Sequence, residues 1–385
     1  MDFKLNEEQV MIVNSARQLA DDFEDEERRL GESKTEIAGH LMKKLAQLNL
    51  TGMTLSSGYG GQDCENLQAV LVLEQLARKC PSLTHIVHET NFGPIRQVDA
   101  FGSDYLKRKY IPPVCNGDKL VSIGMTEPNA GSALTDLATK AELKGNYYIL
   151  NGQKRFVSGA GVSDSYVVFV RLTEERGARG IGTIVVDKGA KGFKLGGRER
   201  MMGFDTVPQR DLIFEDTPVP KENLILNAGE FAKAMLSFDV ERVGNGTASL
   251  GIGQGALESC IEYSQQRYQF GKPICEFQGV QFMLADMAMM VESARFLIYR
   301  AASNSGRGFP GRLESSIAKC YSNEMARKVT DLASDVFGGY GYSLDYRIER
   351  LLRDSRGWAI AAGTPQMQRI GIASELLNRR FDQRK

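Results

Sequence analysis

The chain changes pattern at Met125-Thr126-Glu127-Pro128-Asn129-Ala130-Gly131-Ser132. Before this stretch, from Glu7 to about Pro112, apolar residues recur at three- and four-residue steps, which predicts helices. After it, short β-branched runs such as Tyr166–Val170 and Gly182–Val186 lie between turn residues, which predicts strands. The stretch itself is rich in turn-forming residues. It is therefore expected to be a loop at the entrance to a β-rich domain.

The zone after this loop carries further strand signals. Tyr147–Ser158 is expected to form a β-hairpin, because Asn151-Gly152 is a typical two-residue hairpin turn. Asp211–Asp216 is another predicted strand, and it leads to Pro218 and Pro220. A run of short strands between helical segments indicates an inserted β-barrel or sandwich-like domain.

From Glu230 onward the pattern is helical again and prolines are rare. The segments Glu230–Arg267, Glu276–Gly308 and Leu313–Thr364 contain no proline, so we expect long helices that pack as a bundle. The α–β–α order predicts an α+β protein with three domains. We expect them at residues 1–118 (N-terminal helical), 119–227 (middle β) and 228–385 (C-terminal helical bundle).

The composition narrows the possible classes of function. The 385 residues carry 48 basic and 48 acidic side chains, and this zero net charge argues against a broad nucleic-acid-binding surface. The six cysteines are scattered without a C-x-x-C pair, and the chain has only three histidines, so a metal site is not expected. No apolar run reaches the ~20 residues of a membrane helix. We therefore expect a cytoplasmic protein with no metal, no membrane span and no nucleic-acid partner.

Two further stretches complete a resemblance to a known family. They are Arg267-Tyr268-Gln269-Phe270-Gly271-Lys272-Pro273 and Ile360-Ala361-Ala362-Gly363-Thr364-Pro365-Gln366-Met367-Gln368-Arg369. Together with Met125–Ser132, they resemble motifs of the acyl-CoA dehydrogenase family, and the resemblance covers nearly the whole chain. It implies an N-terminal helical domain, a middle β-barrel domain and a C-terminal four-helix bundle. It also implies bound FAD, a role in fatty acid metabolism, and a homo-oligomer that is usually a tetramer.

The resemblance further implies which residues hold the flavin ring. The loop that lies against the ring corresponds to Met125, Thr126, Gly131 and Ser132. Phe156 matches the aromatic residue that covers one ring face, and Ser158 matches the hydroxyl residue that reaches the N5 edge.

A second group of residues is implied at the pyrophosphate and adenine end of FAD. Arg267, Phe270 and Gln278 match residues by which a neighbouring subunit grips this end, and an arginine fork suits a pyrophosphate. Gly338 and Gly339 match a loop that admits the diphosphate. Thr364 and Gln366 match contacts to the FAD of the neighbouring subunit. Asp335 stands where the family has a glutamine, and it is expected to point away from the pyrophosphate or to pair with a cation.

The position of the catalytic base departs from the usual family pattern. In most members the position of Ala362 holds a glutamate that removes the α-proton of the thioester. An alanine cannot do so, although its backbone N–H can still serve the oxyanion hole of the thioester carbonyl. Glu241, directly before Arg242, matches the base of a minority branch that includes isovaleryl-CoA dehydrogenase. The resemblance therefore implies Glu241 as the base, with hydride transfer to flavin N5.

The acyl thioester is expected to be short, branched or polar. His88 and Arg96 make the segment that would line the acyl pocket more polar than a fatty chain requires. Ser132, Asp239 and Arg242 are candidate contacts for the rest of the substrate. The carrier is either coenzyme A or an acyl-carrier protein, and the expected electron acceptor is an electron-transfer flavoprotein.

Other functions remain open at this point. Relatives without the usual glutamate include enoyl-CoA reductases and an acyl-CoA desulfinase, for which Arg96 or His88 would hold the sulfinate. A non-catalytic flavoprotein is a third possibility. Replacing Glu241 separates the dehydrogenase from the non-catalytic flavoprotein, since only the former would lose a rate while keeping its FAD.

Overall fold

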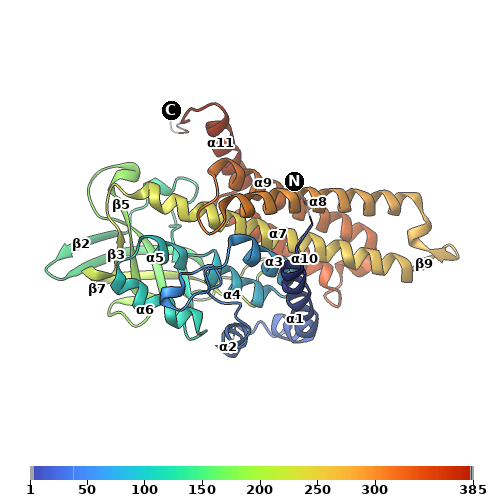
Figure 1. The fold of residues 1–385 in the computed structure, drawn as a ribbon, viewed down its shortest axis with the longest axis horizontal. Coiled ribbons are helices and arrows are strands. Elements are labelled where there is room, and N and C mark those ends of the chain that lie inside the picture. The colour runs from blue at the N-terminus through green and yellow to red at the C-terminus, as the bar shows by residue number, and fades with distance from the viewer. Residues whose placement is uncertain (1–3, 38, 382, 384–385) are drawn as a thin grey trace.

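The structure is a computed structural model, and it describes residues 4–37, 39–381 and 383. The molecule is elongated, with the sheet at one end and long C-terminal helices that extend to the other end (Figure 1). The N-terminal helices lie between these two parts and pack against both. The chain therefore has the predicted α+β organisation, with helical, sheet and helical segments in that order.

In the described residues, the N-terminal segment contains six α-helices. They are α1 (Glu7–Glu32), α2 (Gly39–Gln47), α3 (Asn66–Ala77), α4 (Pro81–Asn91), α5 (Ile95–Phe101) and α6 (Asp104–Cys115). α1 begins at a capping box formed by Asn6 and Gln9, and it buries one face that includes Ala16, Ala20 and Phe23. α3 and α4 are buried along almost their whole length, because they pass through the middle of the molecule.

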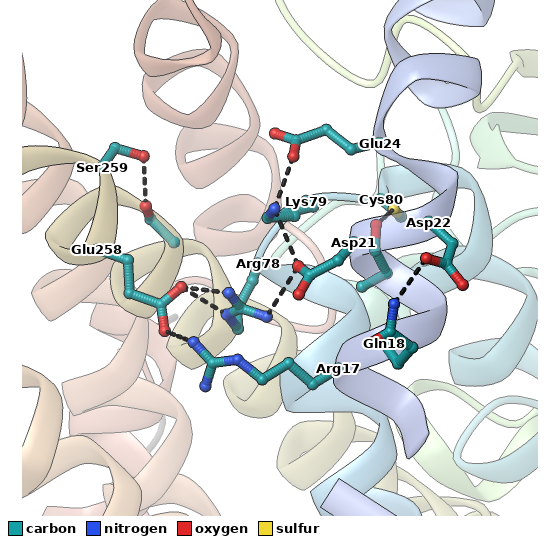
Figure 2. A network of polar contacts seen from close by, with 12 residues as sticks. Arg17, Gln18, Asp21, Asp22, Glu24, Arg78, Lys79, Cys80, Glu258 and Ser259 are labelled. Carbon is teal, nitrogen blue, oxygen red and sulfur yellow. Dashed lines mark hydrogen bonds and ion pairs between the residues drawn. The ribbon is translucent and has the colours of Figure 1, made fainter. Parts of the chain in front are cut away.

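A polar network fastens α1 and the end of α3 to the long helix α7 (Phe231–Gln266) (Figure 2). Glu258 of α7 accepts hydrogen bonds from Arg17 at 2.6 Å and from Nε of Arg78 at 2.8 Å. Lys79 pairs with Asp21 of α1 at 2.9 Å. The Arg78 side chain is only 3% exposed, and its buried charge is compensated by Glu258 and by Asp21 at 3.7 Å.

The middle segment forms one eight-stranded sheet. Its strands are β1 (Val121–Gly124), β2 (Lys140–Lys144), β3 (Tyr147–Ser158), β4 (Ser165–Arg171), β5 (Ile181–Asp187), β6 (Phe193–Leu195), β7 (Gln209–Pro220) and β8 (Leu224–Leu226). The order is β6-β7-β3-β2-β4-β5-β8, and β1 pairs with β4 in parallel. β4 and β5 pair antiparallel and are buried on both faces, as expected for continuous β-branched runs. The strands predicted at residues 166–170, 182–186 and 211–216 are confirmed.

The hairpin predicted within residues 147–158 is wrong, since β3 continues through Asn151 and Gly152 as one strand. The register against β7 shifts just before Gly152, which is a β-bulge. A Cβ at Gly152 would lie 2.6 Å from the side chain of Thr139. A glycine at residue 152 therefore allows the strand to pass close to Thr139. The turn that leads into β3 is instead made at Gly145, whose φ is 62°.

As far as its residues are described, the C-terminal segment is built from α7 and four further helices. They are α8 (Gln278–Ser305), α9 (Arg312–Phe337), α10 (Arg347–Ile360) and α11 (Pro365–Leu376), and the short strands β9 (Tyr268–Gln269) and β10 (Lys272–Pro273) join α7 to α8. α7 packs against α3, α8, α9 and α10. The proline-free segment 313–364 contains two helices, because Gly338 takes a φ of 58° and ends α9. Within the described residues, no helix combines the length and the apolar character needed to cross a membrane.

Glycines let α7 approach its neighbours closely. A Cβ at Gly244 would lie 2.7 Å from Phe92, just after α4, and one at Gly251 would lie 2.5 Å from Ala77 of α3. A glycine inside a helix costs about 1 kcal/mol relative to alanine, so close packing is the benefit that offsets this cost. The contact at Gly244 brings α4 against the part of α7 that carries Glu241.

Candidate active site

Glu241 lies in the first half of α7, where α4 and α9 pack against the helix. Its Oε2 atom is buried, and the described residues offer it no hydrogen bond. Burial raises the pKa of the Glu241 carboxyl group, the charge of Glu89 raises it further, and His88, Lys319 and Arg242 oppose the rise. A buried polar atom without a partner is uncommon, and a buried carboxylate with a shifted pKa is typical of a reaction site.

His88 and Glu89 of α4 form an ion pair close to Glu241. The Nδ1 atom of His88 lies 3.0 Å from Oε1 of Glu89, and the imidazole centroid lies 5.2 Å from the ring of Trp358 in α10. A Cβ at Gly244, one helical turn after Glu241, would lie 3.0 Å from the His88 ring. Burial lowers the pKa of His88, but the hydrogen bond to Glu89 and the charges of Glu89 and Glu241 outweigh it and raise the pKa. His88 therefore keeps its proton to a higher pH than an ordinary histidine does.

Ala362 occupies the turn between α10 and α11, with a φ of 54°. Because an alanine in this left-handed region costs about 1–2 kcal/mol, the turn needs support from its surroundings. Nδ2 of Asn245, one helical turn after Glu241, lies 3.5 Å from the carbonyl oxygen of Ala361. Gln368 donates to the carbonyl of Gly363 at 2.8 Å. The turn predicted to supply an oxyanion-hole N–H therefore lies against the helix that carries Glu241.

The sequence-based prediction missed Lys319 of α9. Its side chain is 0% exposed, and Nζ donates to the carbonyl of Gly363 at 3.0 Å and to Oδ1 of Asn323 at 2.9 Å. Ser315, Lys319 and Ser322 follow one another at four- and three-residue steps on the buried face of α9. A lysine on a buried helix face is unusual. Its place in this pattern is the sequence signal that could have identified Lys319 as a site residue.

A second missed pair fixes the loop Met125–Ser132. Oε1 of Glu127 lies 2.7 Å from Nζ of Lys154 in β3, and the carboxylate accepts the backbone N–H groups of Ala138 and Thr139 at 2.6 and 2.9 Å. Lys154 also donates to the carbonyl oxygen of Met125 at 3.3 Å. Both side chains are buried. The loop is therefore held on β3 by a satisfied internal ion pair.

The predicted ring-binding residues gather around this loop and the end of β3. The backbone N–H of Arg155 donates to the carbonyl of Thr126 at 2.8 Å, so loop and strand end lie side by side. Phe156 is 48% exposed and has a φ of 57°. Met125, Thr126, Gly131 and Ser132 belong to this loop, and Phe156 and Ser158 belong to the end of β3. An exposed aromatic ring beside an exposed glycine-containing loop fits a planar flavin ring.

The predicted pyrophosphate-binding residues line a cleft at the far end of the helices. The cleft is lined by Arg267, Gly338, Gly339 and Tyr340, with the Arg267 guanidinium 5.2 Å from the centre of the Tyr340 ring. Asp335 lines the same cleft. Phe270 is 95% exposed on the connection to α8, and Gln278 is the first residue of that helix. An arginine fork beside glycine backbone fits a pyrophosphate.

A single chain does not bring the predicted flavin-ring-binding residues and the predicted pyrophosphate-binding residues together. Arg267 follows Glu241 by 26 residues along α7, which corresponds to about 39 Å at ~1.5 Å per residue. Figure 1 shows β9, next to Arg267, at the end of the molecule opposite to the sheet. Thr364 and Gln366 lie beside the Ala362 turn, where Thr364 caps α11 and Gln366 is exposed.

The predicted substrate contacts Asp239, Arg242 and Arg96 have different hydrogen-bond partners in the structure. Asp239 forms an ion pair with Arg242 and accepts a hydrogen bond from Ser315 at 3.0 Å. Arg96 is buried, and its guanidinium donates to the carbonyl oxygens of Thr54 and Arg307 at 2.8 and 3.0 Å. Arg96 thus holds two loops together, and these carbonyl oxygens occupy the guanidinium group that was expected to contact the substrate.

Family models cover the chain in three consecutive parts. The N-terminal, middle and C-terminal domains of acyl-CoA dehydrogenase match residues 6–118, 122–217 and 230–377. A 3-sulfinopropanoyl-CoA desulfinase of Paraburkholderia xenovorans is 37% identical over 100% of this chain and 99% of its own length. The caffeyl-CoA reductase-Etf complex subunit CarC of Acetobacterium woodii is 35% identical over 94% of this chain and 97% of its own length.

The fold comparison agrees with the sequence comparison. The solved structure of butyryl-CoA dehydrogenase from Megasphaera elsdenii has a TM-score of 0.93 and 34% identity, and the alignment covers 98% of this chain and 100% of that chain. The resemblance predicted from the three motifs is therefore confirmed. The chain belongs to the acyl-CoA dehydrogenase family and is an FAD-dependent oxidoreductase that acts on CH–CH groups.

Proposed function

We propose that the protein dehydrogenates an acyl thioester between its α- and β-carbons, with Glu241 as the base. The observation that supports this proposal is the buried Oε2 atom of Glu241, which has no hydrogen-bond partner among the described residues. Glu241 lies one helical turn before Asn245, which reaches the carbonyl oxygen of Ala361 beside the Ala362 turn. A general base works best when its pKa lies near the working pH, and burial shifts the pKa of Glu241 in that direction. FAD held by the residues described above would accept the β-hydride at N5, which leaves a trans-enoyl thioester.

The backbone N–H of Ala362 is the proposed donor to the thioester carbonyl. As the α-proton moves to Glu241, negative charge grows on that oxygen, and a positioned N–H stabilises it. This donor belongs to the main chain, so it is present although residue 362 is an alanine where most family members have a glutamate. Glu241 and Ala362 thus divide the two tasks of base and oxyanion donor between α7 and the α10–α11 turn.

We propose a short, branched or polar acyl group. The charges of His88 and Glu89 act on Glu241, Trp358 packs against His88, and the His88–Glu89 pair is buried. A long alkyl chain against this pair would leave its charges poorly solvated. Ser132, Asp239 and Arg242 are the proposed contacts to the carrier, which is coenzyme A or an acyl-carrier protein.

A second candidate is the reverse reaction, the reduction of an enoyl thioester. It is supported by the relative named as a caffeyl-CoA reductase subunit. In that direction a protonated Glu241 would donate to the α-carbon, so the same residues serve both directions. A desulfinase, as in the relative from Paraburkholderia xenovorans, would need a cation free for the sulfinate. Here Arg96 binds backbone carbonyls and His88 binds Glu89.

Glu241→Gln tests the base. We expect flavin reduction by a saturated acyl thioester to fall by about 10²–10⁴-fold, the range typical for a general base, while FAD stays bound and is measured by its visible absorbance. Glu262→Gln removes an exposed carboxylate from the same helix and serves as the matched control. A Glu241→Gln protein that still reduces its flavin at the native rate would show that the base lies elsewhere.

A panel of thioesters mixed anaerobically with the oxidised and the chemically reduced enzyme separates the candidate reactions. Bleaching of oxidised flavin by a short saturated thioester supports dehydrogenation. Reoxidation of reduced flavin by an enoyl thioester, without bleaching by any saturated one, would favour the reductase. Release of sulfite from a sulfinated thioester without a change in flavin absorbance would favour the desulfinase.

We further propose a redox partner, an oligomer and a compartment. An electron-transfer flavoprotein is supported as electron acceptor by the relative that belongs to an Etf complex. A homo-oligomer, up to a tetramer, is supported by Phe282 and Met289 of α8, which lie seven residues apart and are 61% and 62% exposed. In the described chain all six cysteines are free thiols, which fits the reducing cytoplasm.

A further inference from the structure

Lys319 is a buried cation whose two hydrogen-bond acceptors are uncharged. They are the carbonyl oxygen of Gly363 and the amide oxygen of Asn323. A buried ammonium group is costly unless an opposite charge compensates it. The acidic group whose charge supports the protonated form of Lys319 most strongly is Glu241. Lys319 is therefore an electrostatic partner of the proposed base, although it belongs to another helix.

Asn323 extends this contact into a closed network. Its Nδ2 atom donates to Oδ1 of Asn245 at 3.0 Å and to Oγ of Ser249 at 2.7 Å. Asn245 and Ser249 lie one and two helical turns after Glu241 on α7, and Asn245 also reaches the carbonyl of Ala361. The network thus connects α7 to α9, α9 to the Ala362 turn, and that turn back to α7. Its four side chains are buried and hydrogen-bonded to one another, which rigidifies such a network.

We propose that Lys319 is a positioning residue for the dehydrogenation. It fixes the Ala362 turn relative to the helix that carries Glu241, and its positive charge favours the ionised form of that carboxylate. The proposal rests on the proposed function, in which Glu241 is the base and the N–H of Ala362 binds the thioester carbonyl. It adds a third residue, from α9, that sets the geometry of the other two.

The direction of the electrostatic effect follows from the groups around Glu241. These are His88 and Glu89 from α4, Arg242 from α7 itself, and Lys319 from α9. Burial raises the pKa of Glu241 and lowers that of Lys319, and each group's charge opposes the shift of the other. Removal of the Lys319 charge therefore raises the pKa of Glu241 further. Less of the base is then ionised at neutral pH.

Lys319→Met in the FAD-loaded enzyme tests the proposal, because methionine keeps much of the side-chain volume without the charge. We expect the acid limb of kcat/KM to move to higher pH by about one unit, so that the rate on this limb falls about tenfold. FAD content should stay native. Lys319→Gln, which can still donate to Gly363, should move the acid limb equally and retain a higher kcat at alkaline pH than Lys319→Met. If the methionine variant does not fold, the glutamine variant carries the test of the acid limb.

The matched control is Lys328→Met, which removes an exposed lysine from the same helix and should leave the pH profile native. A readout without catalysis comes from a double-mutant cycle of thermal unfolding with Lys319→Met and Glu241→Gln. The two changes should be non-additive, since each alone leaves a buried charge without its partner. Additive effects together with an unmoved acid limb would overturn the role of Lys319. Native activity of Glu241→Gln would instead overturn the proposed function.

Discussion

Three of the predicted site residues, Phe156, Phe270 and Ala362, have φ angles between 52° and 57°. A residue with a side chain in this region costs about 1–3 kcal/mol and persists only where its surroundings require it. For Ala362, these surroundings are three side chains that form hydrogen bonds to its turn. Its turn is held by Lys319, Gln368 and Asn245. The turn therefore keeps its shape without a carboxylate at residue 362, and the base can come from Glu241.

The pKa of a single residue, Glu241, predicts the pH dependence of the reaction. Burial is the main cause that raises the pKa of Glu241 to about 6. The base must be ionised, so kcat/KM should be constant above this value and fall about tenfold per pH unit below it. The measurement is the rate of flavin reduction by a saturated thioester between pH 5 and 9. A profile without a break near pH 6 would contradict the assignment of Glu241.

At the scale of elements, α7 decides which residues meet. Its glycines allow α4 and α3 to approach until a Cβ would overlap with them, and it carries Glu241 and the buried Asn245 and Ser249 in successive turns. Its carboxyl end leads to Arg267. The same helix therefore carries the proposed base near one end and the predicted pyrophosphate ligand at the other.

Gly251→Val tests the close packing of α7. The new Cβ would lie 2.5 Å from both Ala77 Cβ and the carbonyl oxygen of Glu74, so α3 must move. Overpacking of this kind costs about 1–3 kcal/mol, and we expect a lower thermal unfolding midpoint in calorimetry. Gly39→Ala is the control: this glycine is exposed at the start of α2, and the described residues leave space for the added methyl group. An unchanged midpoint for Gly251→Val would show that the contact is loose.

At the scale of the whole molecule, the two predicted FAD-binding groups lie at opposite ends of the C-terminal helices (Figure 1). About 39 Å separate Glu241 from Arg267 along α7. A single chain therefore offers a flavin-ring site near one end and a pyrophosphate site near the other. A homo-oligomer in which neighbouring chains pair these ends would complete each site.

Complementation between two inactive variants tests this shared site. Arg267→Met should lose FAD, and Glu241→Gln should keep FAD but lose activity. Subunits of the two, unfolded and reassembled together, should regain both FAD and activity, because some sites then combine a native Glu241 from one chain with a native Arg267 from the other. Arg179→Met, which removes an exposed arginine near the sheet, is the control for Arg267→Met and should retain FAD. No recovery in the mixed oligomer would show that each chain completes its own site.

The sequence by itself determined the family, the α–β–α order and the strands β4, β5 and β7, because periodicity and short motifs depend on neighbours along the chain. It misplaced the turn at Gly152, since a glycine signals freedom of the backbone but not the contact with Thr139 that uses it. It also missed Lys319 and the Glu127–Lys154 pair. Only the tertiary structure decided that Lys319 donates to the Ala362 turn and lies within electrostatic range of Glu241, because the charge of a buried group is compensated by residues that are distant in the chain and near in space.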